Sequence, residues 1–266
     1  MATLISDIMF TGSLGNLSAY RMKGSDKIIL RKKGGGSREK IRTSPGCEGI
    51  RNVNMEFGGR SQVTRLIRLA MHPVLPLADF NFTGHLHKIL RPIQVMDPVS
   101  APGQRNVHLT RSPGLLDGFS LNNIRTFDSV VRTPLTYSLD KENRSATVTI
   151  PALIPDINFF PHPFHPMYGF VVTLGIVPDL DYGDKQKRYR AHEQYYPFQP
   201  AVTESDWLHV KTRTDAFTLE VTTSNVPPDA NHTLILSVGI RYGTLGDNGE
   251  TQQVARTGSA KIFGAA

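Results

Sequence analysis

The chain is poor in cysteine, because Cys47 is the single cysteine among 266 residues. One thiol cannot form an intramolecular disulfide, which excludes a small secreted fold held by disulfide bridges. Residues 1–7 also lack the basic region and the apolar region that together make a signal peptide. The sequence therefore predicts synthesis in the cytoplasm.

Long hydrophobic runs are absent as well. The longest, residues 170–177, is far shorter than the roughly 20 apolar residues that a membrane helix needs, so we expect no membrane span. The chain also has no nucleophile elbow, no phosphate-binding P-loop and no dinucleotide fingerprint. These absences predict a protein that is not an enzyme and takes no cofactor.

Two histidines, His162 and His165, share a loop that prolines stiffen. A catalytic zinc usually takes three protein ligands, and the sequence offers no third ligand near this pair. We expect a packed, proline-rich loop, with copper or zinc binding as the alternative.

Acidic residues are scarce at one end of the chain. The first 70 residues hold 13 Lys and Arg against 5 Asp and Glu, whereas the remainder holds 17 basic and 18 acidic residues. The net charge of +7 therefore resides in the N-terminal part. Such asymmetry indicates an interaction with a partner and says little about the fold.

What the chain has in abundance is turn-forming residues, with 18 prolines and 23 glycines among short apolar runs. Many short strands are expected from this composition. The apolar content of 39% is sufficient for a proper core.

Residues 1–46 are predicted to form a basic hairpin arm. Residues 14–22 and 27–33 flank Gly24-Ser25-Asp26, which has the composition of a turn. A two-stranded hairpin is marginally stable in water, so the arm must lean on the rest of the protein or on a neighbouring subunit. The residues expected to form this assembly arm are Gly12, Gly15, Asn16, Tyr20, Ile28, Ile29 and Leu30.

A basic strip follows the hairpin and contains the flexible joint Gly34-Gly35-Gly36. Its side chains are expected either to contact a neighbouring copy or to neutralise phosphates. They are Arg31, Lys32, Lys33, Arg38, Lys40 and Arg42.

Residues 47–97 are predicted to be a helical segment with two short helices. Over residues 48–71 the helical spacing places five apolar residues in one stripe, namely Ile50, Val53, Phe57, Ile67 and Met71. A second helix is expected over residues 79–96.

The first of these helices also carries arginines on its other faces. Arg51, Arg60, Arg65 and Arg68 lie outside the apolar stripe. We expect them to form a solvated polar surface.

Residues 98–114 have the composition of a linker, and beyond them the apolar pattern changes to a period of two, which is typical of strands. Residues 115–266 are therefore predicted to form an antiparallel β-sandwich of immunoglobulin-like build, so that the fold is mainly β with a small helical part. About seven strands are expected, over residues 135–139, 145–150, 168–177, 207–211, 217–222, 234–240 and 252–263.

The N-terminal pattern resembles a family of uncharacterised bacterial proteins, common in Bacteroidetes, that open with a Gly-x-x-Gly-Asn-x-x-x-Tyr hairpin. The resemblance covers the first third of the chain at most. It implies a bacterial, β-rich protein without enzymatic activity, and it carries over no catalytic residue. The matching residues are Gly12, Gly15, Asn16 and Tyr20, then Gly24 and Arg31, and then the run Asn54-Met55-Glu56-Phe57-Gly58.

Taken together, the arm and the sandwich predict a structural subunit that polymerises with other copies of itself into a tube, sheath or filament. The alternative is a nucleic-acid-binding or nucleocapsid-like protein that uses the basic strip. No aromatic residue lies between Tyr20 and Phe57, which argues against base stacking along that strip.

Overall fold

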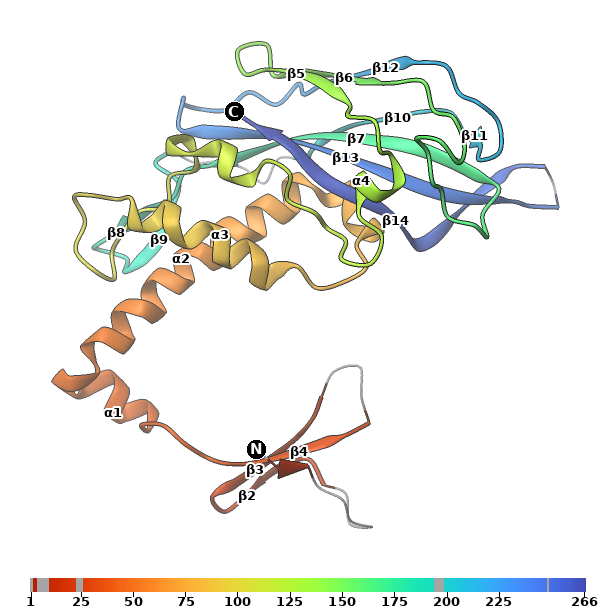
Figure 1. Cartoon of the computed structure of the whole chain (residues 1–266). Coiled ribbons are helices and arrows are strands. Elements are labelled where there is room, and N and C mark those ends of the chain that lie inside the picture. Colours follow the sequence, from red (N-terminus) through yellow and green to blue (C-terminus); the bar gives the residue numbers. More distant parts are fainter. Residues whose placement is uncertain (1, 4–9, 23–25, 194–198, 248) are drawn as a thin grey trace. The chain divides into compact units, whose positions relative to one another are not determined.

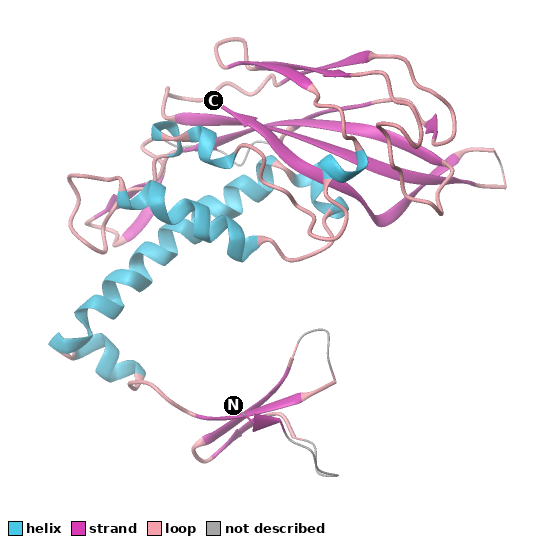
Figure 2. Ribbon diagram, viewed as in Figure 1, coloured by secondary structure: helices cyan, strands magenta, loops and turns pink. Residues whose placement is uncertain are grey.

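The computed structural model describes residues 2–3, 10–22, 26–193, 199–247 and 249–266. The chain divides into two compact units, Met1–Arg51 and Asn52–Ala266. Strand predominates over helix in the mixed α/β fold (Figure 2). The domain boundaries predicted after residues 46, 97 and 114 stay predictions.

The first unit is built on an antiparallel sheet with the strand order β1-β4-β3-β2. The predicted hairpin is present as β3 and β4, and two further strands extend it. Of its predicted turn, Gly24 and Ser25 lie outside the described residues. The elements of this unit are β1 (Ala2–Thr3), β2 (Gly12–Leu14), β3 (Leu17–Arg21), β4 (Ile28–Lys32), α1 (Arg38–Thr43) and the 3₁₀ helix η1 (Pro45–Cys47).

The second unit is organised around a five-stranded antiparallel sheet. Its order is β10-β7-β13-β14, and β11 also pairs with β7. The two long central strands are buried on both faces, which explains their almost continuous apolar sequence. The strands are β7 (Met167–Pro178), β10 (Ala201–Glu204), β11 (Leu208–His209), β13 (His232–Leu245) and β14 (Thr251–Ala265).

A smaller antiparallel sheet covers one face of the five-stranded sheet, and its strand order is β12-β6-β5. Alternate residues of β6, such as Val148 and Ile150, share an apolar core with Val172 of β7 and Val238 of β13. The immunoglobulin-like build stays a prediction. The strands are β5 (Thr136–Asp140), β6 (Ser145–Ile150) and β12 (Phe217–Thr222), and a separate hairpin is formed by β8 (Asp181–Gly183) and β9 (Arg188–Arg190).

Helices cover the opposite face of the five-stranded sheet, so the second unit has three layers (Figure 1). Val63 and Ile67 of α2 and Leu90 of α3 pack with Val171 and Ile235 of the sheet. The helical elements on this face are α2 (Glu48–Ala70), η2 (His72–Leu77), α3 (Thr83–Val95), η3 (Leu109–Arg111) and η4 (Pro113–Leu116). The short helix α4 (Phe127–Val130) instead packs into the core between the two sheets.

Glycines in the sheet allow the helical layer to approach it closely. A Cβ atom on Gly175 of β7 would lie 2.4 Å from the Cβ of Ala70, at the end of α2. A Cβ atom on Gly239 of β13 would lie 2.5 Å from a methyl carbon of Leu77 in η2. Real Cβ atoms do not pack this tightly, so a side chain at either position would force its neighbour to move.

The structure corrects the predicted helical segment in two respects. The first helix is long, with 23 residues, and not short. Its predicted apolar stripe is also divided: Ile67 and Met71 are fully buried, but Ile50, Val53 and Phe57 are between 49% and 60% exposed. The reason is that the C-terminal part of α2 supplies the residues that pack on the sheet.

Arg60 and the predicted linker are more buried than expected from the sequence. Arg60, expected on a solvated surface, is only 8% exposed. In the predicted linker, residues 98–114, Val107 and Leu109 are fully buried, and Val107 pairs with Leu180 in an isolated bridge. This segment therefore packs into the core on the helical side of the sheet.

Candidate interaction surface

The residues predicted for the assembly arm lie in the sheet of the first unit. Gly15 and Asn16 form the two-residue turn that joins β2 to β3, and Gly15 has a φ of 53°, a conformation that glycine adopts at little cost. The backbone carbonyl of Asn16 accepts a hydrogen bond of 2.6 Å from the N–H of Lys33. Gly12, at the start of β2, has a φ of 120°. The glycines of the predicted motif thus shape the edge of the sheet.

The apolar residues of the arm fall on both faces of this sheet, because neighbouring side chains along a strand alternate. Ala19 is paired with Leu30 and Tyr20 with Ile29. Ala19 and Ile28 are buried, whereas Ile29 and Leu30 are half-buried and Tyr20 is exposed. The sheet therefore has apolar side chains on two faces.

Several apolar side chains of this unit are in contact with solvent. Leu14 is 63% exposed, and Leu17, Tyr20 and Met22 are also exposed. Sequence reasoning included only Tyr20 among these four. Leu14 and Leu17, which the sequence analysis did not include, flank the Gly15-Asn16 turn. Their position next to polar residues is the sequence pattern that could have indicated them.

The basic residues occupy two elements separated by the predicted glycine joint. Arg31 and Lys32 end β4 and Lys33 follows it, while Arg38, Lys40 and Arg42 belong to α1. All six side chains are exposed. Their charges therefore face solvent within this unit.

Four contacts fix these basic elements locally. The guanidinium of Arg31 lies 5.5 Å from the ring centroid of Tyr20, a cation–π contact between paired strands. Ser37 caps α1 by accepting a hydrogen bond of 3.2 Å from the N–H of Lys40. Arg51 donates to the carbonyls of Ile41 and Ser44, at 2.9 and 2.8 Å, and so holds the end of α1.

The histidine pair lies in the second unit. The rings of His162 and His165 are stacked with centroids 4.6 Å apart, next to the buried ring of Tyr242. Burial, followed by the neighbouring His165 and Arg125, lowers the pKa of His162. Within the described ranges, no group of three or more His, Cys, Asp or Glu is placed to hold a metal ion.

A buried polar network, which sequence reasoning missed, joins α2 to α3 and β9. Arg60 donates to the side-chain oxygen of Gln94, and Gln94 donates to the carbonyl of Arg105 at 2.9 Å and to the hydroxyl of Tyr189 at 3.2 Å. Gly59 lies against the Tyr189 ring, where a Cβ would be 2.7 Å away. No local sequence motif predicts this network, because its members are far apart in the sequence.

A carboxylate in this region, that of Asp97, is held by backbone donors. The side chain of Asp97 accepts hydrogen bonds from the N–H groups of Val99, Ser100 and Asn106. Burial alone would raise its pKa, but these hydrogen bonds outweigh burial and hold the pKa at about 2. Asp97 is therefore ionised near neutral pH and organises the segment after α3 through these hydrogen bonds.

No protein-family model, curated protein or solved structure matches the chain. Among the described residues, no helix is both long enough and apolar enough to cross a membrane.

Proposed function

We propose that the protein is a structural subunit that assembles with other copies of itself into a tube, sheath or filament through its N-terminal unit. The observation that carries this proposal is the distribution of apolar side chains in that unit. Among its described residues, only Ala19 and Ile28 are buried hydrophobics, whereas Leu14, Leu17 and Tyr20 are exposed.

A unit of this size needs more buried apolar surface than Ala19 and Ile28 supply. Short sheets without a hydrophobic face covered by a partner are marginally stable in water, and chains of about 50 residues often depend on oligomerisation or another constraint. A second copy that covers the exposed leucines would supply the missing burial.

The edge strand β2 offers a way to make that contact. Among the described strands β2 pairs with β3 alone, and a strand from another copy that paired with its outer edge would extend the sheet. Strand addition of this kind joins subunits head to tail, and such contacts propagate when they do not close into a ring. In this proposal residues 52–266, including the immunoglobulin-like build of residues 115–266, form the wall of the assembly.

The test compares the full-length protein with a double variant, Leu14→Asp with Leu17→Asp, by sedimentation velocity and negative-stain electron microscopy. We expect large particles from the wild type and small species from the double variant, because two buried carboxylates would disfavour the contact. The matched control is Val226→Asp, which charges an exposed valine of the second unit and should leave the particles intact. A wild type that stays monomeric under native conditions contradicts the proposal.

The second candidate function is nucleic-acid binding by the basic strip. The observation that favours it is that none of the six strip cations forms an ion pair with an acidic side chain among the described residues. Six phosphate contacts would give a logarithmic salt dependence with a slope of about −5 on duplex DNA.

Fluorescence anisotropy with a labelled DNA duplex at several salt concentrations tests this candidate. Lys32→Gln with Lys33→Gln should reduce the slope by about 2 if both side chains contact phosphates. An affinity that is independent of salt excludes nucleic-acid binding and leaves the assembly proposal untouched.

A further inference from the structure

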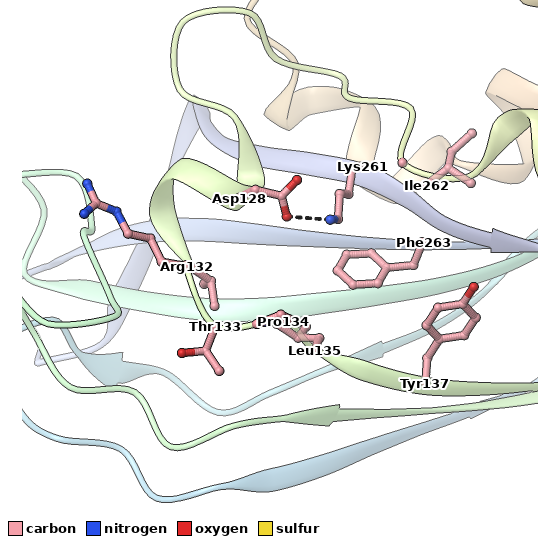
Figure 3. A pocket seen from close by; sticks show the side chains of 11 residues that line it. Asp128, Arg132, Thr133, Pro134, Leu135, Tyr137, Lys261, Ile262 and Phe263 are labelled. Carbon is pink, nitrogen blue, oxygen red and sulfur yellow. Dashed lines mark hydrogen bonds and ion pairs between the residues drawn. The ribbon is translucent and has the colours of Figure 1, made fainter.

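A pocket of about 440 Å³ opens in the second unit, between β14 and the segment that leads into β5 (Figure 3). This volume lies in the range of small-molecule sites, roughly 300–1,000 Å³. Its lining includes Asp128, Tyr137, Lys261 and Phe263, and also Arg132, whose guanidinium lies over the ring of Phe160.

The pocket gives access to the core between the two sheets. Two of its lining residues, Val131 and Phe263, belong to that core. On the side of β10 and β12 the sheets are bridged, because the hydroxyl of Thr203 donates to the carbonyl of Glu220 at 2.7 Å. The side of β5 and β14 is the one at which the pocket opens.

Lys261 places a poorly solvated cation on the wall of the pocket. Its ammonium lies 2.5 Å from a carboxylate oxygen of Asp128 and 4.4 Å from the ring centroid of Phe263. The side chain of Lys261 is 16% exposed, whereas that of Asp128 is 69% exposed. The cation is therefore held inside while its partner remains in solvent at the rim.

The ammonium group retains hydrogen-bonding capacity in this arrangement. It has three donors, and the structure gives Asp128 as its carboxylate partner. Among the described residues the ammonium also lies over the rings of Phe127 and Phe263, which attract a cation without accepting a conventional hydrogen bond. A second carboxylate would find a charge-assisted donor here.

Aromatic side chains beside Lys261 provide a rigid apolar surface. Figure 3 shows the Phe263 ring between Lys261 and Tyr137. The Tyr137 and Phe263 rings meet edge to face, with centroids 6.2 Å apart and planes at 89°. Tyr137 is fixed against Gly264, where a Cβ would come within 2.6 Å of its ring.

The Tyr137 hydroxyl adds a second donor at the far end of this surface. Burial, and then the charge of Asp117, raise the pKa of Tyr137. The hydroxyl therefore stays protonated near neutral pH and can donate a hydrogen bond.

From this geometry we propose that the pocket binds a small organic carboxylate with a flat apolar body. The carboxylate bonds to the ammonium of Lys261, and the apolar body lies on Phe263 and Tyr137 next to Leu135. This binding activity is separate from assembly and does not rest on the proposed function.

The test is isothermal titration calorimetry of the full-length protein with benzoate, and with benzylamine as the probe of opposite charge. Lys261→Met keeps the apolar stem and should weaken benzoate binding at least about tenfold, because a hydrogen bond to a charged group is lost. The matched control, Lys211→Met, removes an exposed lysine elsewhere and should bind benzoate like the wild type.

Asp128→Asn distinguishes an anionic from a cationic ligand. Removing the competing carboxylate should tighten benzoate binding, whereas a cationic ligand held by Asp128 would be lost. If Lys261→Met does not fold, Lys261→Arg takes its place; this variant keeps the charge and should still bind benzoate. The change in benzoate affinity caused by Asp128→Asn then tests the proposal. The proposal is overturned if benzoate gives no binding heat, if benzylamine binds in its place, or if Asp128→Asn weakens benzoate binding.

Discussion

Single glycines decide how closely the helical layer lies on the five-stranded sheet. Gly175 and Gly239 face Ala70 and Leu77 at distances that leave no room for a Cβ. By contrast, a Cβ on Gly58, inside α2, would meet nothing within 4 Å. Gly175 and Gly239 therefore disfavour a side chain, whereas Gly58 in the same unit has space for one.

Gly175→Ala should lower the free energy of unfolding by about 1–3 kcal/mol, because the added methyl group overpacks the contact with Ala70. Gly58→Ala should raise it by roughly 0.5–1 kcal/mol, since alanine favours the helix. Urea unfolding followed by the fluorescence of Trp207, the single tryptophan, measures both. Equal stabilities for the two variants would refute the close packing.

At the level of secondary-structure elements, a buried amide holds the helices to the segment that follows them. Gln94 of α3 is fully buried and bonds to Arg60 of α2, to the backbone of Arg105 and to Tyr189 of β9. Burial, as the largest effect, lowers the pKa of Arg60. The loss of a partner for this guanidinium is therefore costly.

Gln94→Leu should reduce the free energy of unfolding by about 1–3 kcal/mol, because it leaves buried polar groups without their hydrogen bonds. The exposed residue Gln253, changed to Leu, serves as the control and should alter stability by less than about 0.5 kcal/mol. Urea unfolding of both variants is the measurement. A Gln94→Leu protein as stable as the control would mean that the network contributes nothing.

Elements with a strong period were predictable from the sequence. The helix expected over residues 48–71 is α2, Glu48–Ala70, and the strand expected over residues 145–150 is β6, Ser145–Ile150. Periodicity could not reveal which part of α2 meets the sheet, since Phe57 and Ile67 fit the same pattern but differ in burial. It also could not show that Lys261 and Asp128 meet, because they lie 133 positions apart.

On the scale of the whole molecule, histidines whose pKa is lowered by folding link stability to pH. Burial is the largest cause of the lowered pKa of His87, of His162 and of His232. Each folded-state pKa is below the unfolded value of about 6.5, so the unfolded chain binds more protons as the pH falls. Stability is therefore complete above about pH 6.5 and declines below it.

We expect the urea midpoint to be lower at pH 5 than at pH 7.5. Asp97 does not contribute in this window, because its carboxyl titrates between the unfolded value of about 3.9 and the folded pKa of about 2. His162→Gln should make the midpoint less sensitive to pH, because it removes one of the histidines whose pKa burial lowers. A midpoint that is the same at both pH values contradicts this account.

The small core of the N-terminal unit has a further consequence for how the proposed assembly begins. If the sheet around Ala19 and Ile28 is completed by a second copy, its folding depends on protein concentration through mass action. In dilute protein this unit would be the first part cut by a protease, and at high concentration it would become resistant. Subunit concentration itself would then act as the signal that switches on polymerisation.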